Sequence, residues 1–405
     1  MLQLFAIGQP SVAGDDQIKT NQESSLKFSG YFQPQFRVRR DDSLAATEAG
    51  QFSGGVFARN ANNEFDIRRG RVKATYTKGL TQAVIQLDAT PGSVIPVDIY
   101  GVIVEPWLRS FGLQVGLFNR PFGYEVELSS GKRESPERTR ATQTLFPGER
   151  DIGAKLFYKA PDNGLLSLEI ELGVMNGTGR STEDYDSFKD IITQASISIP
   201  LDDEKTNLGI GASGYFGKVA SGTQTVFNPS SDGFLEMTSA DNLGKGLKRT
   251  YYGGNVQFST ELPSLGTLSI RGEVVAGKQP GTSSSTVSPS RQPSGDLYQR
   301  NLLGWYVNLV QNLGSQNQIV VKYDVYDPNT DAGAADFIAS SNLTPADVKF
   351  STLGFGFIHH WDSQVKFVFY YEVIQNEELS SASSITRYTS NLKDDIFTLR
   401  MQVAF

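Results

Sequence analysis

The sequence contains no cysteine and only two histidines among its 405 residues. The lack of cysteine excludes disulfides, thiolate metal sites and cysteine nucleophiles. No stretch approaches the roughly 18 consecutive apolar residues that indicate a membrane-spanning helix. The formal net charge is −7 and no basic block stands out, so nucleic acid is not an expected partner.

What the sequence does contain is alternation with period two. In residues 26–39, apolar side chains such as Phe28 and Phe36 alternate with polar or charged ones such as Gln33 and Arg37. The same pattern recurs at 111–117, 151–159, 166–172, 319–326, 365–372 and 397–405. Such alternation predicts strands that separate an apolar medium from a polar one, and therefore an all-β protein.

The connections between these strands alternate in length. Seven short turns are interleaved with eight longer polar segments, near 40–63, 91–96, 119–148, 175–189, 218–247, 279–298, 329–346 and 376–390. Sixteen strands with short turns at one end and long loops at the other are typical of a bacterial outer-membrane barrel. A closed barrel also satisfies every backbone group in lipid.

The sequence therefore predicts one transmembrane antiparallel β-barrel over residues 25–405, with long extracellular loops. Residues 1–24 are expected to be an N-terminal tail or the remnant of a signal peptide. The strand that ends in Phe405 is expected to pair with the first strand, because a barrel leaves no open edge. The alternative is a soluble all-β protein such as a propeller, but no repeat of about 40–50 residues is present.

Three motifs resemble the phosphate-selective porin O and P family: Phe65-Asp-Ile-Arg-Arg-Gly-Arg-Val72, Gly116-Leu-Phe-Asn-Arg-Pro-Phe-Gly-Tyr-Glu125 and Leu145-Phe-Pro-Gly-Glu-Arg-Asp-Ile-Gly153. The strand layout agrees with this resemblance from about residue 26 to 405. The resemblance implies a sixteen-stranded, trimeric barrel whose third loop, 119–148, folds into the lumen. One departure is that the strongly basic constriction of that family is diluted here by acidic residues.

The loop 119–148 and its flanks are crowded with charge of both signs. If the loop folds inward, its basic residues would raise the local concentration of anions in a narrow channel. The candidate constriction and anion-binding residues are Arg120, Lys132, Arg133, Arg138, Arg140 and Arg150, together with the strand residues Arg37, Arg39, Arg69 and Arg71. Two alternatives are that the loop is solvated surface, and that the charges form ion-pair ladders which stiffen the wall.

The alternation slips around Arg68, Arg69 and Arg71, which predicts a β-bulge there or an irregularity at Gly70. At least one of these arginines should point into the lumen, because a lipid-facing arginine at mid-depth costs about 2–4 kcal/mol.

The expected function is an outer-membrane porin that lets small hydrophilic solutes diffuse passively, with a mild preference for phosphate-like anions. The expected partners are such solutes, outer-membrane lipid and two further copies in a homotrimer. The alternative is a non-conducting barrel that serves as an adhesin or as a subunit of an envelope complex. An enzyme is not expected, because His359 and His360 are the only histidine bases and lie near a short turn. No cofactor or metal is expected; the acidic segment 324–331 lacks the spacing of an EF-hand calcium loop.

Overall fold

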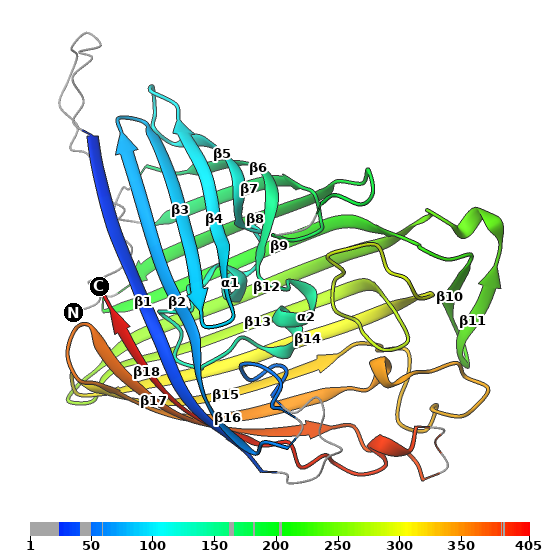
Figure 1. The fold of residues 1–405 in the computed structure, drawn as a ribbon. Helices are drawn as coiled ribbons and strands as arrows, with labels where there is room; N and C mark the ends of the chain where they lie inside the picture. The colour runs from blue at the N-terminus through cyan, green and yellow to red at the C-terminus, as the bar shows by residue number, and fades with distance from the viewer. Residues whose placement is uncertain are drawn as a thin grey trace.

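The computed structural model describes residues 24–40, 50–58, 60–161, 166–180, 183–201, 205–381, 383 and 385–405. Most of these residues form long tilted strands that curl into a barrel (Figure 1). The predicted tail 1–24 lies outside the described residues, except that Ser24 already belongs to the first strand.

Sixteen strands make the barrel wall. They are β1 (Ser24–Arg39), β2 (Asn63–Lys78), β3 (Thr81–Thr90), β4 (Ser93–Val104), β5 (Phe111–Asn119), β6 (Arg150–Lys159), β7 (Ser167–Met175), β8 (Asp190–Leu201), β9 (Thr206–Ala220), β12 (Gly246–Leu262), β13 (Gly266–Gly281), β14 (Leu297–Leu313), β15 (Asn317–Asp327), β16 (Phe350–His360), β17 (Val365–Asn376) and β18 (Ile396–Ala404). Each wall strand pairs antiparallel with the next along the chain, and β9 pairs with β12. The predicted barrel is confirmed.

The first and last strands close the barrel. The register of β1 on β18 runs from Tyr31 opposite Ala404 to Arg39 opposite Ile396. Beyond it, the backbone N–H groups of Gly30 and Phe405 each donate to the other residue's carbonyl, at 2.9 and 3.0 Å. A Cβ at Gly30 would lie 2.4 Å from the Arg71 backbone carbonyl oxygen and 2.5 Å from the Phe405 ring, so a glycine is needed at this closure. The predicted pairing of the last strand with the first is confirmed.

The two faces of the wall have the polarity that a membrane requires. Outward-facing apolar side chains are exposed, including Phe28 (66%) and Tyr252 (60%), whereas inward-facing Gln33 and Arg37 are each only 2% exposed. A soluble barrel would show the reverse, so the soluble alternative is wrong. A closed barrel with an apolar exterior places the chain in a bacterial outer membrane.

Two of the predicted loops differ from expectation. The segment 218–247 contains a hairpin, β10 (Thr225–Ser230) and β11 (Gly233–Thr238), which projects beyond the wall (Figure 1). The predicted loop 91–96 is only a two-residue turn, because Ser93 and Val94 already pair with Thr90 and Ala89. A Pro-Gly pair suffices to reverse the chain there.

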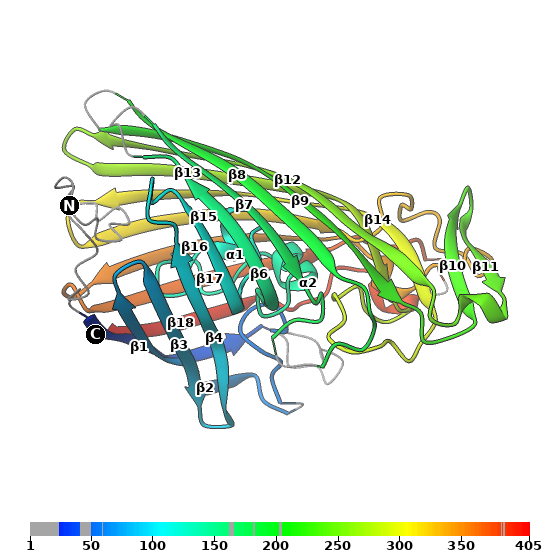
Figure 2. The same ribbon diagram turned by 90° about the horizontal axis from the view of Figure 1, so that it is seen from above.

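The helices are short: α1 (Tyr124–Glu127), α2 (Arg140–Leu145) and the 3-10 turns η1 (Ala240–Asn242), η2 (Pro345–Asp347) and η3 (Thr386–Tyr388). None of the helices in the described part of the chain is long and apolar enough to cross a membrane. Both α1 and α2 belong to the segment between β5 and β6, and both views place them inside the barrel (Figures 1 and 2).

Candidate functional site

Residues 119–149, here called the inward loop, touch the wall on widely separated strands. The Tyr31 hydroxyl of β1 lies 2.6 Å from the Ser130 hydroxyl. Lys366 of β17 donates to the Gly131 carbonyl at 3.1 Å, and the Gly123 N–H donates to Ser213 of β9 at 2.9 Å. Because β9 lies far from β1 and β17 in the strand order, the loop crosses the interior of the barrel. The predicted inward fold of the third loop is confirmed, and the solvated-surface alternative is wrong.

On one side of the loop, the ion pairs with the wall converge on the carboxylate of Glu137. Its oxygens lie 2.9 Å from Arg68 Nε, Arg69 Nη2 and Arg400 Nη2, and 4.0 Å from Arg133 Nη2. Burial alone would raise the pKa of Glu137, but the charges of Arg68, Arg69 and Arg400 hold that pKa well below its usual range. One negative charge thus gathers four positive ones.

The predicted β-bulge explains how two consecutive arginines reach one carboxylate. Gln33 pairs with Arg69 and Pro34 with Ile67, so Arg68 is the extra residue and faces no partner on β1. Pro34 has no N–H to give to the ladder, and a bulge is where a strand proline is tolerated. A bulge re-aims side chains locally, and here both Arg68 and Arg69 turn inward to Glu137.

A second acidic centre, Glu149, lies at the end of the loop. It forms ion pairs with Arg138 and, at 2.8 Å, with Arg150. Arg150 Nε also donates to Asp98 of β4 at 3.0 Å. The Arg138 guanidinium also donates hydrogen bonds of 2.7 Å to the backbone carbonyls of Glu125 and Leu128, around α1. Arg138 therefore holds the loop's own backbone.

The two acidic centres belong to one network, here called the arginine cluster. Arg71 pairs with Asp88 at 3.1 Å, and its charge acts on Glu149. The charges of Arg133 act on both Glu137 and Glu149. The cluster consists of eight arginines and four carboxylates: Arg68, Arg69, Arg71, Arg133, Arg138, Arg150, Arg180 and Arg400, with Asp88, Asp98, Glu137 and Glu149.

Two arginines of the cluster keep spare hydrogen-bond donors. Arg133 is 4% exposed, and its Nε and Nη1 have no hydrogen-bond partner among the described residues. Arg180, in the loop between β7 and β8, forms no ion pair within the described chain and lies against Gly148, where a Cβ would be 3.1 Å from its Nε. Arg180 was not predicted, because nothing in its sequence surroundings indicates that it reaches the inward loop.

The opposite side of the inward loop is held by two kinds of contact, polar and apolar. The polar contacts centre on Glu125 and Glu273. Lys322 of β15 and Thr139 and Thr142 of the loop each donate to the Glu125 carboxylate, at 2.7 Å. Glu273 of β13 accepts from the backbone N–H groups of Tyr124 and Glu125 at 3.1 and 2.9 Å. These contacts fix α1 against the middle of the wall.

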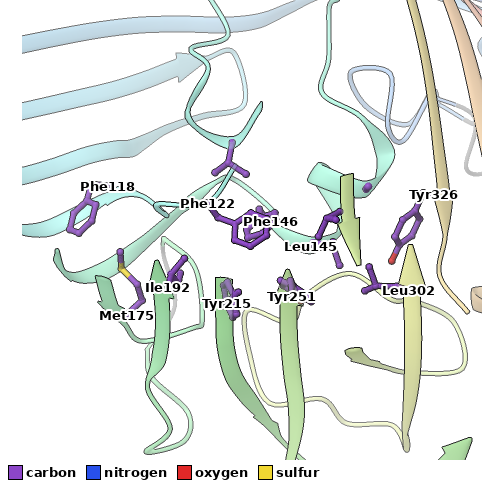
Figure 3. Close-up of a cluster of buried hydrophobic side chains, with 13 residues drawn as sticks. Phe118, Phe122, Leu145, Phe146, Met175, Ile192, Tyr215, Tyr251, Leu302 and Tyr326 are labelled. Carbon is purple, nitrogen blue, oxygen red and sulfur yellow. The ribbon is translucent and has the colours of Figure 1, made fainter. Parts of the chain in front are cut away.

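Next to these contacts the loop packs on an apolar patch of the lumen (Figure 3). The rings of Phe122 and Phe146 lie 4.8 Å apart and meet Tyr251, whose ring lies 4.9 Å from that of Tyr215. The cluster comprises Phe118, Phe122, Val126, Ala141, Leu145, Phe146, Met175, Ile192, Tyr215, Tyr251, Val275, Leu302 and Tyr326. Alternation alone predicted inward faces that meet water, so this patch was missed.

The remaining predicted residues lie outside the arginine cluster. Arg37 binds the carbonyls of Ser53 and Gly55 at 3.0 and 2.8 Å and pairs with Glu64, so it secures the first loop. Arg39 and Arg37 both face the Phe57 ring, at 5.9 and 4.6 Å.

Three further predicted residues belong to the inward loop but not to its arginine cluster. Arg120 pairs with Asp151 at 3.2 Å. Arg140 lies between the rings of Phe52 and Phe350, at 4.3 and 3.7 Å, and Lys132 is exposed. Of the ten predicted positions, Arg69, Arg71, Arg133, Arg138 and Arg150 are thus brought together.

The histidines and the acidic segment show no catalytic or metal-binding arrangement. His359 and His360 lie 2.9 and 3.2 Å from the side-chain oxygens of Asn317 and Gln318. In the segment 324–331, Asp327 accepts from the Asn329 N–H, a turn contact. The described residues contain no group of three or more side chains able to hold a metal ion.

Comparison with known proteins finds similarity at the level of the fold. No family model and no curated protein sequence matches the chain. Among solved structures, OprB of Pseudomonas putida is 9% identical with a TM-score of 0.59, covering 94% of each chain. The outer-membrane channel DcaP of Acinetobacter baumannii is 12% identical with a TM-score of 0.56, covering 94% of this chain and 97% of that one. The anion-selective porin from Comamonas acidovorans is 10% identical with a TM-score of 0.55, covering 95% of this chain and all of that one.

Proposed function

We propose that the chain is an outer-membrane porin through which small hydrophilic solutes diffuse passively, with a mild preference for anions. The observation that carries the proposal is the arginine cluster, in which eight guanidinium groups face four carboxylates inside the barrel. A sixteen-stranded barrel leaves a water-filled lumen, and a loop across it narrows the passage. The chain is not an enzyme in this proposal.

The arginines outnumber the carboxylates in the cluster, and their excess positive charge lies in the narrowed part of the lumen, where water and salt screen it least. In a narrow passage with low-dielectric walls, fixed charges of one sign concentrate mobile ions of the other sign. The unpartnered Nε and Nη1 of Arg133 are buried, so Arg133 acts on a passing anion through its charge. Arg180 is partly exposed and forms no ion pair within the described chain, whereas the other arginines are largely occupied by carboxylates. The carboxylates of Asp88, Asp98, Glu137 and Glu149 offset part of this field, so the preference is mild rather than strict. Binding stays weak enough for release.

Phosphate-like anions and a trimer are the finer parts of the proposal. They are supported by the resemblance of the three motifs, since Arg68, Arg69, Arg71, Glu149 and Arg150 of those motifs all belong to the arginine cluster. A groove of about 800 Å³ along β17, β18, β1 and β2, lined by apolar side chains such as Phe36, Phe65 and Leu399 and by the polar Asp66 and Arg68, is a candidate contact surface for a second copy.

Reconstitution in a planar bilayer tests the proposal. Discrete conductance steps are expected, with a reversal potential in asymmetric KCl on the anion side and a reduction of chloride current when phosphate is added. A bilayer that shows no steps would instead support the adhesin or envelope-subunit alternative. A cation-side reversal potential would overturn the anion preference while leaving the porin intact.

A further inference from the structure

The outer surface of the barrel carries a row of lysines on three neighbouring strands. Lys218 of β9 lies directly opposite Lys248 of β12, and Lys278 of β13 lies opposite Thr250, two residues further along β12. All three side chains are exposed, and they share the outward face of their strands with Phe216 and Tyr252. The row therefore faces the surroundings of the barrel and not its lumen.

The apolar band beside the lysine row indicates where the row lies along the membrane normal. On β13 the outward positions from Leu268 to Ala276 are apolar or glycine, and Lys278 follows directly at the end that leads into a long loop. On β12, Tyr252, Val256 and Phe258 follow Lys248 in the same way. About 9–11 tilted residues span the hydrocarbon layer. The lysines thus stand at the polar boundary of the outer leaflet.

A pocket of about 900 Å³ lies at this row. It is lined by the three lysines, by Phe216, Tyr252 and Ala276 on the membrane side, and by Ser187, Phe188 and Lys189 of the preceding loop. The Phe188 ring lies 5.3 Å from Lys218 Nζ. Gly246 makes room for both, because a Cβ there would be 2.8 Å from the Phe188 ring and 2.9 Å from Lys218 Cδ. The Phe188 ring and the Lys218 side chain thus pack closely at the edge of the pocket.

The charges of the row are not neutralised by the protein. Lys189 pairs with Asp184, but Lys218, Lys248 and Lys278 form no ion pair with any carboxylate of the described residues. Like charges directly opposite one another on neighbouring strands are destabilising. An external anion at this position would remove that repulsion.

We propose that the lysine row binds the phosphate groups of a lipid in the outer leaflet, whose acyl chains lie along Phe216, Tyr252 and Ala276. The pocket combines the two surfaces that such a lipid needs, cationic groups at headgroup height and apolar side chains below them. Free phosphate would meet only three exposed lysines and would gain little from them in water. The proposal rests on the membrane location of the barrel and is independent of the pore and its selectivity.

Binding of bisphosphorylated lipid A tests the proposal. The full chain is titrated in neutral detergent with lipid A, and in parallel with phosphatidylcholine and with inorganic phosphate. Since a lysine near an anionic lipid surface contributes about a factor of five in binding, replacing Lys218, Lys248 and Lys278 by Gln should weaken lipid A binding about a hundredfold. Phosphatidylcholine binding should not change.

A matched control has the same loss of charge elsewhere: Lys205, Lys349 and Lys393, all exposed, replaced by Gln. This variant should bind lipid A like the native chain. The single variant Lys278→Gln, with a loss of several-fold, serves if the triple variant does not fold. Unchanged lipid A affinity in the row variants, an equal loss in the control, or displacement of lipid A by an equal concentration of inorganic phosphate would each overturn the proposal. The reversal potential of the pore should be the same in all variants.

Discussion

The inward loop rests on two sides of the lumen that differ in kind. Toward β2 and β18 the loop forms ion pairs gathered around Glu137, whereas toward β9 and β12 it packs aromatic rings around Phe122. Ion pairs and apolar packing have different consequences inside a barrel. In the proposed porin, the field of the charged side would act on solutes, and the apolar side would exclude water and hold the loop in place. We therefore expect selectivity and rigidity to depend on different halves of the inward loop.

The largest effect is expected when the charged side loses Glu137, the carboxylate that faces four arginines. Glu137→Ala leaves buried arginines facing one another, and breaking a buried ion pair in this way costs about 3–5 kcal/mol. Thermal unfolding should occur at lower temperature, and the remaining pore should favour anions more strongly in asymmetric KCl. Glu134→Gln is the control, because Glu134 pairs only with the less buried Arg271, at 2.8 Å. Equal destabilisation by both variants would contradict the hub role of Glu137.

A smaller loss of stability is expected on the apolar side. Phe122→Ala removes a fully buried ring at the centre of the patch and should cost about 3 kcal/mol. The inward loop should then detach more often, which single-channel recordings would show as added current fluctuations, while the sign of the reversal potential stays the same. Phe28→Ala on the outer face is the control. A change in ion preference of the size seen for Glu137→Ala would show that the two sides do not have separate roles.

The charges of Arg133 and Arg180, which are less fully paired than those of the other arginines, should affect selectivity more than stability. In the double variant Arg133→Gln with Arg180→Gln, the anion preference should fall and phosphate should block less, while the unfolding temperature changes by only a few degrees. Arg291→Gln, an exposed loop substitution, is the charge control. By contrast, Arg138→Ala should destabilise the inward loop, since it removes the donors to Glu125 and Leu128. An unaltered reversal potential in the double variant would remove Arg133 and Arg180 from the anion path.

The smallest effect on selectivity is expected for Arg37→Gln. Arg37 is buried by the first loop and binds Ser53, Gly55 and Glu64, so its charge is separated from the arginine cluster. Loss of a hydrogen-bonded charged group should cost about 1.5–3 kcal/mol of stability, with no measurable shift of the reversal potential. A shift comparable to that of the double variant would return Arg37 to the constriction, where the sequence placed it.

The fold could be predicted because its signal is local. Alternation assigns each side chain to a face, and the slip at Arg68 to Gly70 located the β-bulge without any knowledge of the partner strand. The candidate site was predicted only in part. Arg69, Arg133 and Arg150 are brought together in the arginine cluster, whereas Arg37 and Arg140 face aromatic or loop partners, and Arg180 was missed because it comes from another loop.

The sequence by itself determined the strands of the barrel wall, their number and which side chains face the lumen rather than lipid. This was possible because a period of two depends only on the extended backbone. Tertiary structure decided which residues pack on the inward face: Glu137 on the arginines of β2 and β18, and Phe122 on Tyr251 of β12. These pairs are far apart along the chain, so their meeting depends on how the barrel closes and where the loop turns. Neither the closure of the barrel nor the path of the loop can be predicted from a local sequence pattern.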